Sequence, residues 1–305
     1  RDPVVVAQGA AAAGPAPVVN LDPTAHLKRG VVQDSAAARQ SFYRPSTGGA
    51  ARVSADLPAS TVARLSEQVS VRAMMDSFDF NLPDTTRFQD TRYRAKLVLR
   101  RYIPKPNGKL RPLGIPATAD KLLQIGVSKI LEAIYEADFL DGSYGYRPGV
   151  GALDAVKALS AALRSGRYHY LVEADIRSFF DRIDHGKLIE LLALRIDDKA
   201  FLRLIRKWLK AGILEPDGRV NHPEVGSPQG GSVSPILANL YLHHALDLWV
   251  EDTVKAHCQG AVLLCRYADD FVCAFEHQAD AERFYRVLGK RLETFGLEVA
   301  AEKTN

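Results

Sequence analysis

Two adjacent aspartates, Asp269 and Asp270, stand in the stretch RYADDFV at residues 266–272. Apolar segments flank them on both sides, at residues 261–265 and 271–275. This layout predicts a tight β-hairpin whose turn carries both acids. Because successive side chains on a regular strand face opposite sides, only a turn lets both acids approach one site. The alternative is an ordinary solvated turn, since turns favour aspartate in any case.

A third acid, Asp175, ends an apolar run in the stretch YLVEADIRSFFD at residues 170–181. A strand-end acid combined with acids from a separate turn meets the needs of a two-metal phosphoryl-transfer centre. In such a centre, ions ~3.5–4 Å apart clamp the attacking and leaving oxygens. Oxygen ligands suit Mg²⁺, which usually also binds substrate phosphates. Taken alone, Asp175 would be an ordinary strand-end acid or a helix cap.

Five further blocks accompany the YADD stretch, and the six together resemble the reverse transcriptases encoded by group II introns and their bacterial relatives. The blocks follow the order of that family over residues 92–305. They are RYIPKPNGKLRPLGIP at 101–116, SYGYRPG at 143–149, EADIRSFFDRIDH at 173–185, GSPQGGSVSP at 226–235, YADD at 267–270 and EKT at 302–304. A YADD stretch alone would be weak evidence for the family, whereas six blocks in the order of the family make the resemblance specific.

The resemblance implies an α+β fold with the fingers and palm of a right-hand polymerase, a mixed β-sheet flanked by helices, and no thumb. Residues 91–305 would form the fingers and palm. Residues 1–90 would be a divergent, partly flexible N-terminal extension, because the GIDG-like signature that relatives carry before the fingers is not found there.

The same resemblance implies an RNA-directed DNA polymerase that extends a DNA primer on an RNA template with dNTPs. Asp175, Asp269 and Asp270 would be its catalytic and metal-binding residues. Asp175 and Asp269 would bind two Mg²⁺ ions, for which Mn²⁺ could substitute, and Asp270 would support the site electrostatically. Like charges brought close are costly without a cation, which argues against a purely structural role for the three.

Five residues are expected, from the resemblance, to contact the incoming dNTP. Lys105 and Arg111 would reach the triphosphate, where arginine can make a bidentate contact. Phe180 would exclude a ribose 2′-hydroxyl, Gln229 would position nucleotide and template, and Lys303 would protonate the leaving pyrophosphate. The alternatives are a solvated hairpin for the basic pair, a core phenylalanine and a loop amide without such a role.

The position of Phe180 depends on the local backbone, because Phe179 precedes it. If the chain is extended there, the two rings point to opposite sides, one to the core and one to the site.

The resemblance also implies two residues that bind nucleic acid, Lys109 and Arg147. Arg147 would touch template phosphate, with a salt bridge as its alternative, and Lys109 could be merely exposed.

The composition is that of an ordinary globular chain of 305 residues, with 47% hydrophobic and 25% charged residues and a formal net charge of +4. Nine Lys or Arg and one acid lie between Arg87 and Arg111, which fits phosphate contact, although a solvated charged face is the alternative. Three cysteines without CxxC spacing predict free thiols in a reducing cytosol. The absence of an ~18-residue apolar run predicts no membrane span, and a bacterial cytoplasmic location is expected.

Periodicity and turn residues predict the secondary structure. Strands are expected at 96–103 and 110–115, and extended pieces at 222–225 and 297–301. Helices are expected at 57–80, 119–139, 152–163, 234–253 and 278–295, with two more within 187–214.

Two other functions remain open at this stage. One is an RNA-binding maturase, a splicing cofactor with intron RNA as its partner, which needs an RNA-gripping region beyond the palm. The other is an inactive, truncated fragment, for which the unusual N-terminus and missing thumb argue. A viral-type RNA polymerase is disfavoured by Phe180 and by Ala268, where those enzymes usually place glycine.

Overall fold

The computed structural model describes residues 93–104, 108, 110–227 and 229–300, together with two short strands, β1 (Tyr43–Pro45) and β2 (Glu67–Val69). The contacts divide the chain into two units, Arg1–Ser41 and Phe42–Asn305, and every described element belongs to the second.

Strands β1 and β2 pair in antiparallel fashion, with Arg44 opposite Gln68. The helix expected over residues 57–80 is therefore wrong at residues 67–69, because pairing with a distant strand overrides the local helical pattern. The rest of that expected helix lies outside the described residues.

A four-stranded sheet in the order β4-β3-β6-β7 lies in the part of the chain expected to form the fingers. Its strands are β3 (Val98–Pro104), β4 (Leu110–Ile115), β6 (Ile213–Leu214) and β7 (Val220–Asn221). The two long strands agree with the sequence, whereas residues 213–214 were expected to end a helix. Gly212 explains the difference, because a Cβ there would lie 2.7 Å from a Leu97 side-chain carbon and 2.8 Å from the His222 ring. A side chain at position 212 would have to displace these side chains, so glycine favours the close approach of this segment to β3.

A three-stranded antiparallel sheet in the order β5-β9-β8 lies in the part expected to form the palm. The strands are β5 (Tyr170–Ala174), β9 (Asp270–Phe275) and β8 (Val262–Tyr267). The register aligns Val172 with Cys273 and Cys273 with Leu264, and this row is buried in the core. The next positions along each strand face the opposite side, as the two-residue period of a strand requires.

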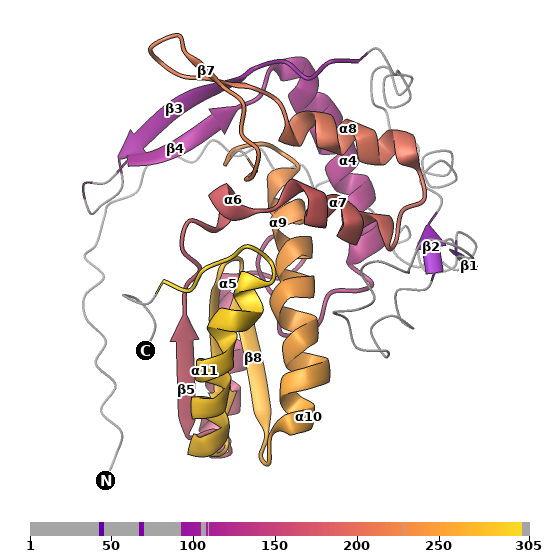
Figure 1. The fold of residues 1–305 in the computed structure, drawn as a ribbon. Coiled ribbons are helices and arrows are strands. Elements are labelled where there is room, and N and C mark those ends of the chain that lie inside the picture. The colour runs from indigo at the N-terminus through magenta and orange to yellow at the C-terminus, as the bar shows by residue number, and fades with distance from the viewer. Residues whose placement is uncertain are drawn as a thin grey trace. The chain divides into compact units, whose positions relative to one another are not determined.

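Helices cover the core face of this sheet and form the rest of the hydrophobic core. Figure 1 shows α11 beside β5, and the long helical segment that begins with α9 beside β8. The main helices are α4 (Thr118–Tyr135), α5 (Ala152–Arg164), α6 (Phe179–Arg182), α7 (His185–Ala193), α8 (Lys199–Leu209), α9 (Ser234–Leu242), α10 (Lys255–His257) and α11 (Gln278–Glu293).

Between α9 and α10 the helix widens twice into π-helical turns, η2 (His243–Asp247) and η3 (Val250–Val254). The single long helix expected over residues 234–253 is therefore present, but not as regular α-helix. Such turns are uncommon and often accompany functional sites. Within the described residues, no helix is both long enough and apolar enough to cross a bilayer.

Candidate active site

Asp175 and Asp270 lie at the same end of the pairing between β5 and β9. The last residues paired in this ladder are Ala174 and Phe271. Because the strands are antiparallel, the next position along β5 is Asp175 and the facing position on β9 is Asp270. The sequence predicted a hairpin turn that carries both aspartates, whereas Asp270 already belongs to β9 and only Asp269 lies in the turn.

Both carboxylates line one cavity of about 450 Å³. Glu173, Tyr267 and Cys265 from the same sheet face also line it, and α5 closes it with Ala155, Val156 and Leu159. Asp269 is not among its lining residues. The cavity therefore joins two of the three expected catalytic acids and adds a carboxylate, Glu173, that the sequence analysis did not single out.

The backbone of Asp175 is held on its other edge by the segment that follows α11. The Ala300 N–H donates to the Asp175 carbonyl at 2.8 Å, and the Arg177 N–H donates to the Glu298 carbonyl at 2.8 Å. A single bridge pairs Ile176 with Val299. This segment is extended over the described part of the range expected from the sequence, and it fixes the end of β5 at the cavity.

The turn that carries Asp269 is short, because Tyr267 already pairs with Asp270 in the ladder between β8 and β9. Ala268 has a left-handed backbone with φ of 57°. An alanine pays an energetic cost in this region, so the surrounding contacts must hold it there.

A neighbouring segment, residues 142–146, runs along β8 beside this turn. The backbone N–H of Arg266 donates to the Gly142 carbonyl, and the backbone N–H of Tyr144 donates to the Arg266 carbonyl. Gly145 faces the turn so closely that a Cβ there would lie 2.1 Å from the Ala268 nitrogen. The absence of a side chain at Gly145 thus allows the segment to pack on the turn.

The charged groups around the turn affect the pKa of Tyr146, the next residue. Burial raises the pKa of its phenol, and the charges of Asp269 and Asp270 raise it further, whereas Arg111 lowers it. Arg111 lies exposed on β4 of the fingers. The fingers arginine and the turn acids therefore act on the same side chain.

Phe179 and Phe180 occupy the short helix α6, not an extended segment. Phe179 is buried in the core, whereas Phe180 is half-buried and packs against the edge of that core. The backbone is helical here, so the condition under which the two rings would point to opposite sides is not met, although one ring is in the core and the other is more accessible. A left-handed Ser178, with φ of 48°, makes the turn into the helix.

The loop that carries Gln229 forms backbone hydrogen bonds with both α6 and β4. The Ser227 N–H donates to the Phe180 carbonyl at 2.7 Å, and the Gly114 N–H of β4 donates to the Gln229 carbonyl at 2.6 Å. Gly230 has φ of 111°, and a Cβ there would lie 2.7 Å from the Gly114 oxygen. The half-buried Gln229 is thus fixed next to β4.

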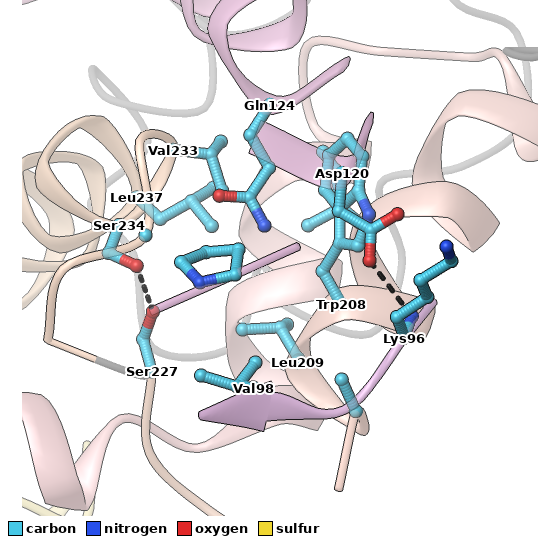
Figure 2. Close-up of a pocket in the computed structure, with 14 residues that line it drawn as sticks. Lys96, Val98, Asp120, Gln124, Trp208, Leu209, Ser227, Val233, Ser234 and Leu237 are labelled. Atoms are coloured by element: carbon cyan, nitrogen blue, oxygen red, sulfur yellow. Dashed lines mark hydrogen bonds between the residues drawn. The ribbon is translucent and has the colours of Figure 1, made fainter. Parts of the chain in front are cut away.

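Polar side chains behind the loop hold it in place (Figure 2). The Gln124 side-chain oxygen accepts from the Ser232 N–H at 2.9 Å, and the Ser227 and Ser234 hydroxyls are 2.9 Å apart. Gln124, Ser227 and Ser234 line a small cavity of about 20 Å³ with Trp208 and other side chains. This volume is enough for about one water molecule.

Arg147 forms the salt bridge that was the alternative to a template contact. Its Nη2 lies 2.7 Å from Glu136 Oε1, and its Nη1 donates to the carbonyls of Leu140 and Ser143. These bonds hold Arg147 against the end of α4. Its contact with template phosphate stays a prediction. Lys105, Lys109 and Lys303 lie outside the described residues.

Asp175, Asp270 and Glu173 line the cavity, but they do not form a closed metal cage. Within the described part of the chain, no group of three or more His, Cys, Asp or Glu side chains is arranged to hold a metal ion. Asp175 and Asp270 on one cavity nevertheless fit Mg²⁺, which proteins usually hold through one or two carboxylates while substrate phosphates and waters complete the shell.

Besides Glu173, two more residues of the site were not predicted from the sequence. Arg266 is fully buried and bonds to the turn, and Tyr146 is left-handed, with φ of 56°, beside the turn. A charged residue at a core-facing position of the otherwise apolar stretch 262–266 was a usable signal for Arg266. Nothing in the local sequence marks the conformation of Tyr146.

The chain belongs to the reverse transcriptase family, because the family model described as reverse transcriptase (RNA-dependent DNA polymerase) matches residues 103–305. It is similar to the group II intron-encoded protein LtrA of Lactococcus lactis subsp. cremoris, with 46% identity over 163 residues. It is also similar to the protein YkfC of Escherichia coli K12, with 37% identity over 208 residues. The group II intron type expected from the sequence is thereby confirmed.

These matches cover 53% and 59% of this chain, and the chain spans 26% of LtrA and 54% of YkfC. Among solved structures, the telomerase of Candida albicans in complex with telomeric RNA superposes with a TM-score of 0.53 at 16% identity. That superposition covers 72% of this chain and 42% of the telomerase. At this identity the likeness concerns the fold alone, and it agrees with the expected fingers and palm.

Proposed function

We propose that this chain forms the fingers and palm of an RNA-directed DNA polymerase that extends a DNA primer with dNTPs. The observation that carries the proposal is the register of β5 and β9, which brings Asp175 and Asp270 to the wall of one cavity in a chain of the reverse transcriptase family. We further propose an RNA template as its partner and a bacterial cytoplasmic location.

Asp175, Asp269 and Asp270 would hold two Mg²⁺ ions, or Mn²⁺ in their place. Bound ions of this kind activate the attacking hydroxyl and neutralise the leaving pyrophosphate. Asp175 and Asp269 would bind the ions, and Asp270 would support the site electrostatically from the strand next to that of Asp175. The rigid strand ends keep these oxygens in position before substrate arrives.

The fingers residues would bind and orient the nucleotide. Arg111 would pair with the triphosphate through two parallel N–H bonds, and Lys105 would add a point charge. Phe180 would exclude a 2′-hydroxyl, and Gln229 would fix the nucleotide against the template. Lys303 would donate a proton to the pyrophosphate. Lys109 and Arg147 would contact nucleic acid.

Primer extension by the purified chain on an annealed RNA template, with dNTPs and Mg²⁺, tests the proposal. Asp175→Asn, Asp269→Asn and Asp270→Asn should each lower the rate by more than about 100-fold, since even the outer partners of metal ligands are worth 10–100-fold. Glu190→Gln, at an exposed position on α7, is the control and should extend normally. Equal extension by Asp270→Asn and Glu190→Gln would reject the proposal.

A maturase role is the second candidate, favoured by one face of α8. Exposed basic residues recur there at helical spacing, at Lys199, Arg203, Arg206 and Lys210. Basic side chains along one helix face fit a phosphate backbone. Intron RNA is the partner in this reading. Unaltered intron splicing with Asp269→Asn would support it, provided that the paired change Arg203→Gln and Arg206→Gln weakens RNA binding. The paired change Arg286→Gln and Lys290→Gln on α11 is the matched control.

A further inference from the structure

We infer that Arg266 is a positioning residue of the active site, whose buried guanidinium fixes the turn that presents Asp269 and Asp270. The inference deepens the proposed polymerase function and rests on it. It concerns a residue that touches neither substrate nor metal and acts through the backbone of Ala268.

The Arg266 side chain is fully buried, and each of its nitrogens has partners. Nε and Nη2 donate to the two Asp247 carboxylate oxygens at 2.6 and 2.5 Å. Nη1 donates to the Ala268 carbonyl at 3.0 Å and to the Asn239 side-chain oxygen at 2.8 Å, and Nη2 also donates to the Ser143 hydroxyl at 2.7 Å. An arginine has five N–H donors, so these five bonds use its full capacity.

The partners come from segments that are far apart in the sequence. Asp247 lies in η2, Asn239 lies in α9, and Ser143 belongs to the segment that packs on the turn. The guanidinium therefore ties the turn to the long helix on one side and to the segment with Tyr146 on the other.

The bond to Ala268 connects this network to the acids. Ala268 is left-handed, and the turn between the paired Tyr267 and Asp270 contains only Ala268 and Asp269. In so short a turn, the orientation of the Ala268 peptide sets the direction in which Asp269 leaves the strand. A donor that holds the Ala268 oxygen thus holds the geometry of the acid pair.

The charge of Asp247 keeps the network intact. Burial opposes ionisation of this carboxyl, but the Arg266 charge and its hydrogen bonds hold the pKa of Asp247 below its usual range. His243 Nδ1 lies 3.7 Å from the same carboxylate. An ionised Asp247 accepts both arms of the guanidinium and leaves the remaining N–H groups free to reach the turn, Asn239 and Ser143.

A buried ion pair that only stabilises the fold is the rival explanation, and Arg195 provides the matched comparison. Arg195 is also almost fully buried, and its Nε lies 2.8 Å from Asp138 Oδ2. This pair joins the turn after α4 to the segment after α7, neither of which belongs to the hairpin. A lysine at either position keeps the charge but cannot reproduce the planar fork.

Arg266→Lys and Arg195→Lys in the full chain separate the two explanations. Both should lower the urea midpoint. Only Arg266→Lys should lower kcat for primer extension, by about 10–100-fold, the range for partners that orient a ligand. The KM for dNTP should change little, and the Mg²⁺ concentration for half-maximal rate should rise. Equal kcat in the two variants would overturn the inference.

Amide hydrogen exchange of the peptide over residues 266–271 gives a readout without catalysis. Arg266→Lys should speed exchange in this peptide, and Arg195→Lys should leave it unchanged. If the wild-type chain extends no primer, the proposed function fails, while this exchange result still decides the positioning role. Unchanged exchange in Arg266→Lys would overturn that role.

Ser143→Ala is a milder variant for the case in which Arg266→Lys does not fold. It removes one of the five bonds and keeps the ion pair with Asp247. A smaller loss in kcat and a smaller rise in hairpin exchange are expected. Wild-type values for both quantities would overturn the inference.

Discussion

At the scale of single residues, the site is marked by backbone strain. Within the described part of the chain, the non-glycine residues with positive φ are Tyr146, Ser178 and Ala268. Each lies in a segment that forms the candidate active site, and each pays roughly 1–2 kcal/mol for a left-handed backbone. Strain of this kind persists where surrounding contacts leave no alternative, which is typical of functional sites.

Gly145 should tolerate no side chain, because a Cβ would lie 2.1 Å from the Ala268 nitrogen. Gly145→Ala must push the turn away, so we expect a loss of about 1–3 kcal/mol in the free energy of unfolding. The rate of primer extension should also fall, because the displaced turn carries Asp269. Urea unfolding and single-turnover extension would measure both effects.

Gly289→Ala is the matched control for Gly145→Ala. Gly289 lies inside α11, and a Cβ there would meet nothing within 4 Å. Alanine should raise the free energy of unfolding by about 0.5–1 kcal/mol, because glycine weakens a helix interior. A Gly145→Ala chain as stable as the Gly289→Ala chain would contradict the close packing on the turn.

Phe180→Val tests sugar discrimination. If the ring blocks a 2′-hydroxyl, the smaller side chain should raise incorporation of rNTPs relative to dNTPs by at least about 10-fold, as the removal of a steric contact in a substrate pocket does. The ratio of kcat/KM for the two nucleotides is the measurement. Phe179→Val should instead lower stability without a change in this ratio, because Phe179 is buried in the core.

At the scale of elements, prediction succeeded where a pattern extends over several residues. Alternation predicted β3, the turn residues after it led to bounds for β4 that match the structure, and the apolar–acid–apolar layout located the hairpin of β8 and β9. The two-residue strand β6 escaped because so short a strand has no period to detect. The π-helical turns escaped because each spans only five residues inside a longer helix, too few to show a change in the apolar period.

The loop that carries Gln229 depends on a side chain of α4. Gln124→Met keeps the volume but removes the acceptor for the Ser232 N–H. A fully buried donor left without a partner costs about 1–3 kcal/mol, and the half-buried Ser232 N–H should cost less. We expect this loss in urea unfolding, together with a higher KM for dNTP as the loop loosens. Gln278→Met, at the exposed start of α11, should change neither quantity, and equal effects would contradict the anchoring role.

At the scale of the whole molecule, the sequence located more of the site than of its support. Asp175 and Asp270 were expected to meet because Asp175 ends an apolar run and Asp270 stands between the two apolar arms of a hairpin. The contact of Arg266 with Ser143 could not be foreseen, because the two residues lie 123 positions apart and only the assembled fold brings them together. Three of the expected residues, Lys105, Lys109 and Lys303, lie outside the described part of the chain, and their roles stay predictions.

Folding should become less favourable below pH ~6.5, the ordinary range of histidine. Burial, and then the charge of His243, holds the pKa of His244 well below that value, with Asp247 acting in the opposite direction. As the pH falls through ~6.5, the unfolded chain binds a proton at this position and the folded chain does not. The free energy of unfolding should then fall by up to about 1.4 kcal/mol per pH unit.

Urea unfolding between pH 7.5 and 5.5 measures this slope. His244→Leu removes the buried imidazole, so the variant should show a shallower slope than the wild type. The other titrating groups are common to both chains and cancel in the comparison. Parallel slopes for the two chains would contradict a neutral, buried His244.

The pairing of β5 with β9 also determines when, during folding, the chain becomes able to catalyse the reaction. The two strands are far apart in sequence, with several helices between them that need only nearby partners. Pairings between remote segments form slowly, because a long loop must close first. During synthesis or refolding, helical signal should therefore recover before the carboxylate pair exists. A kinetic intermediate with native-like helicity would show no primer extension, because that activity depends on both acids.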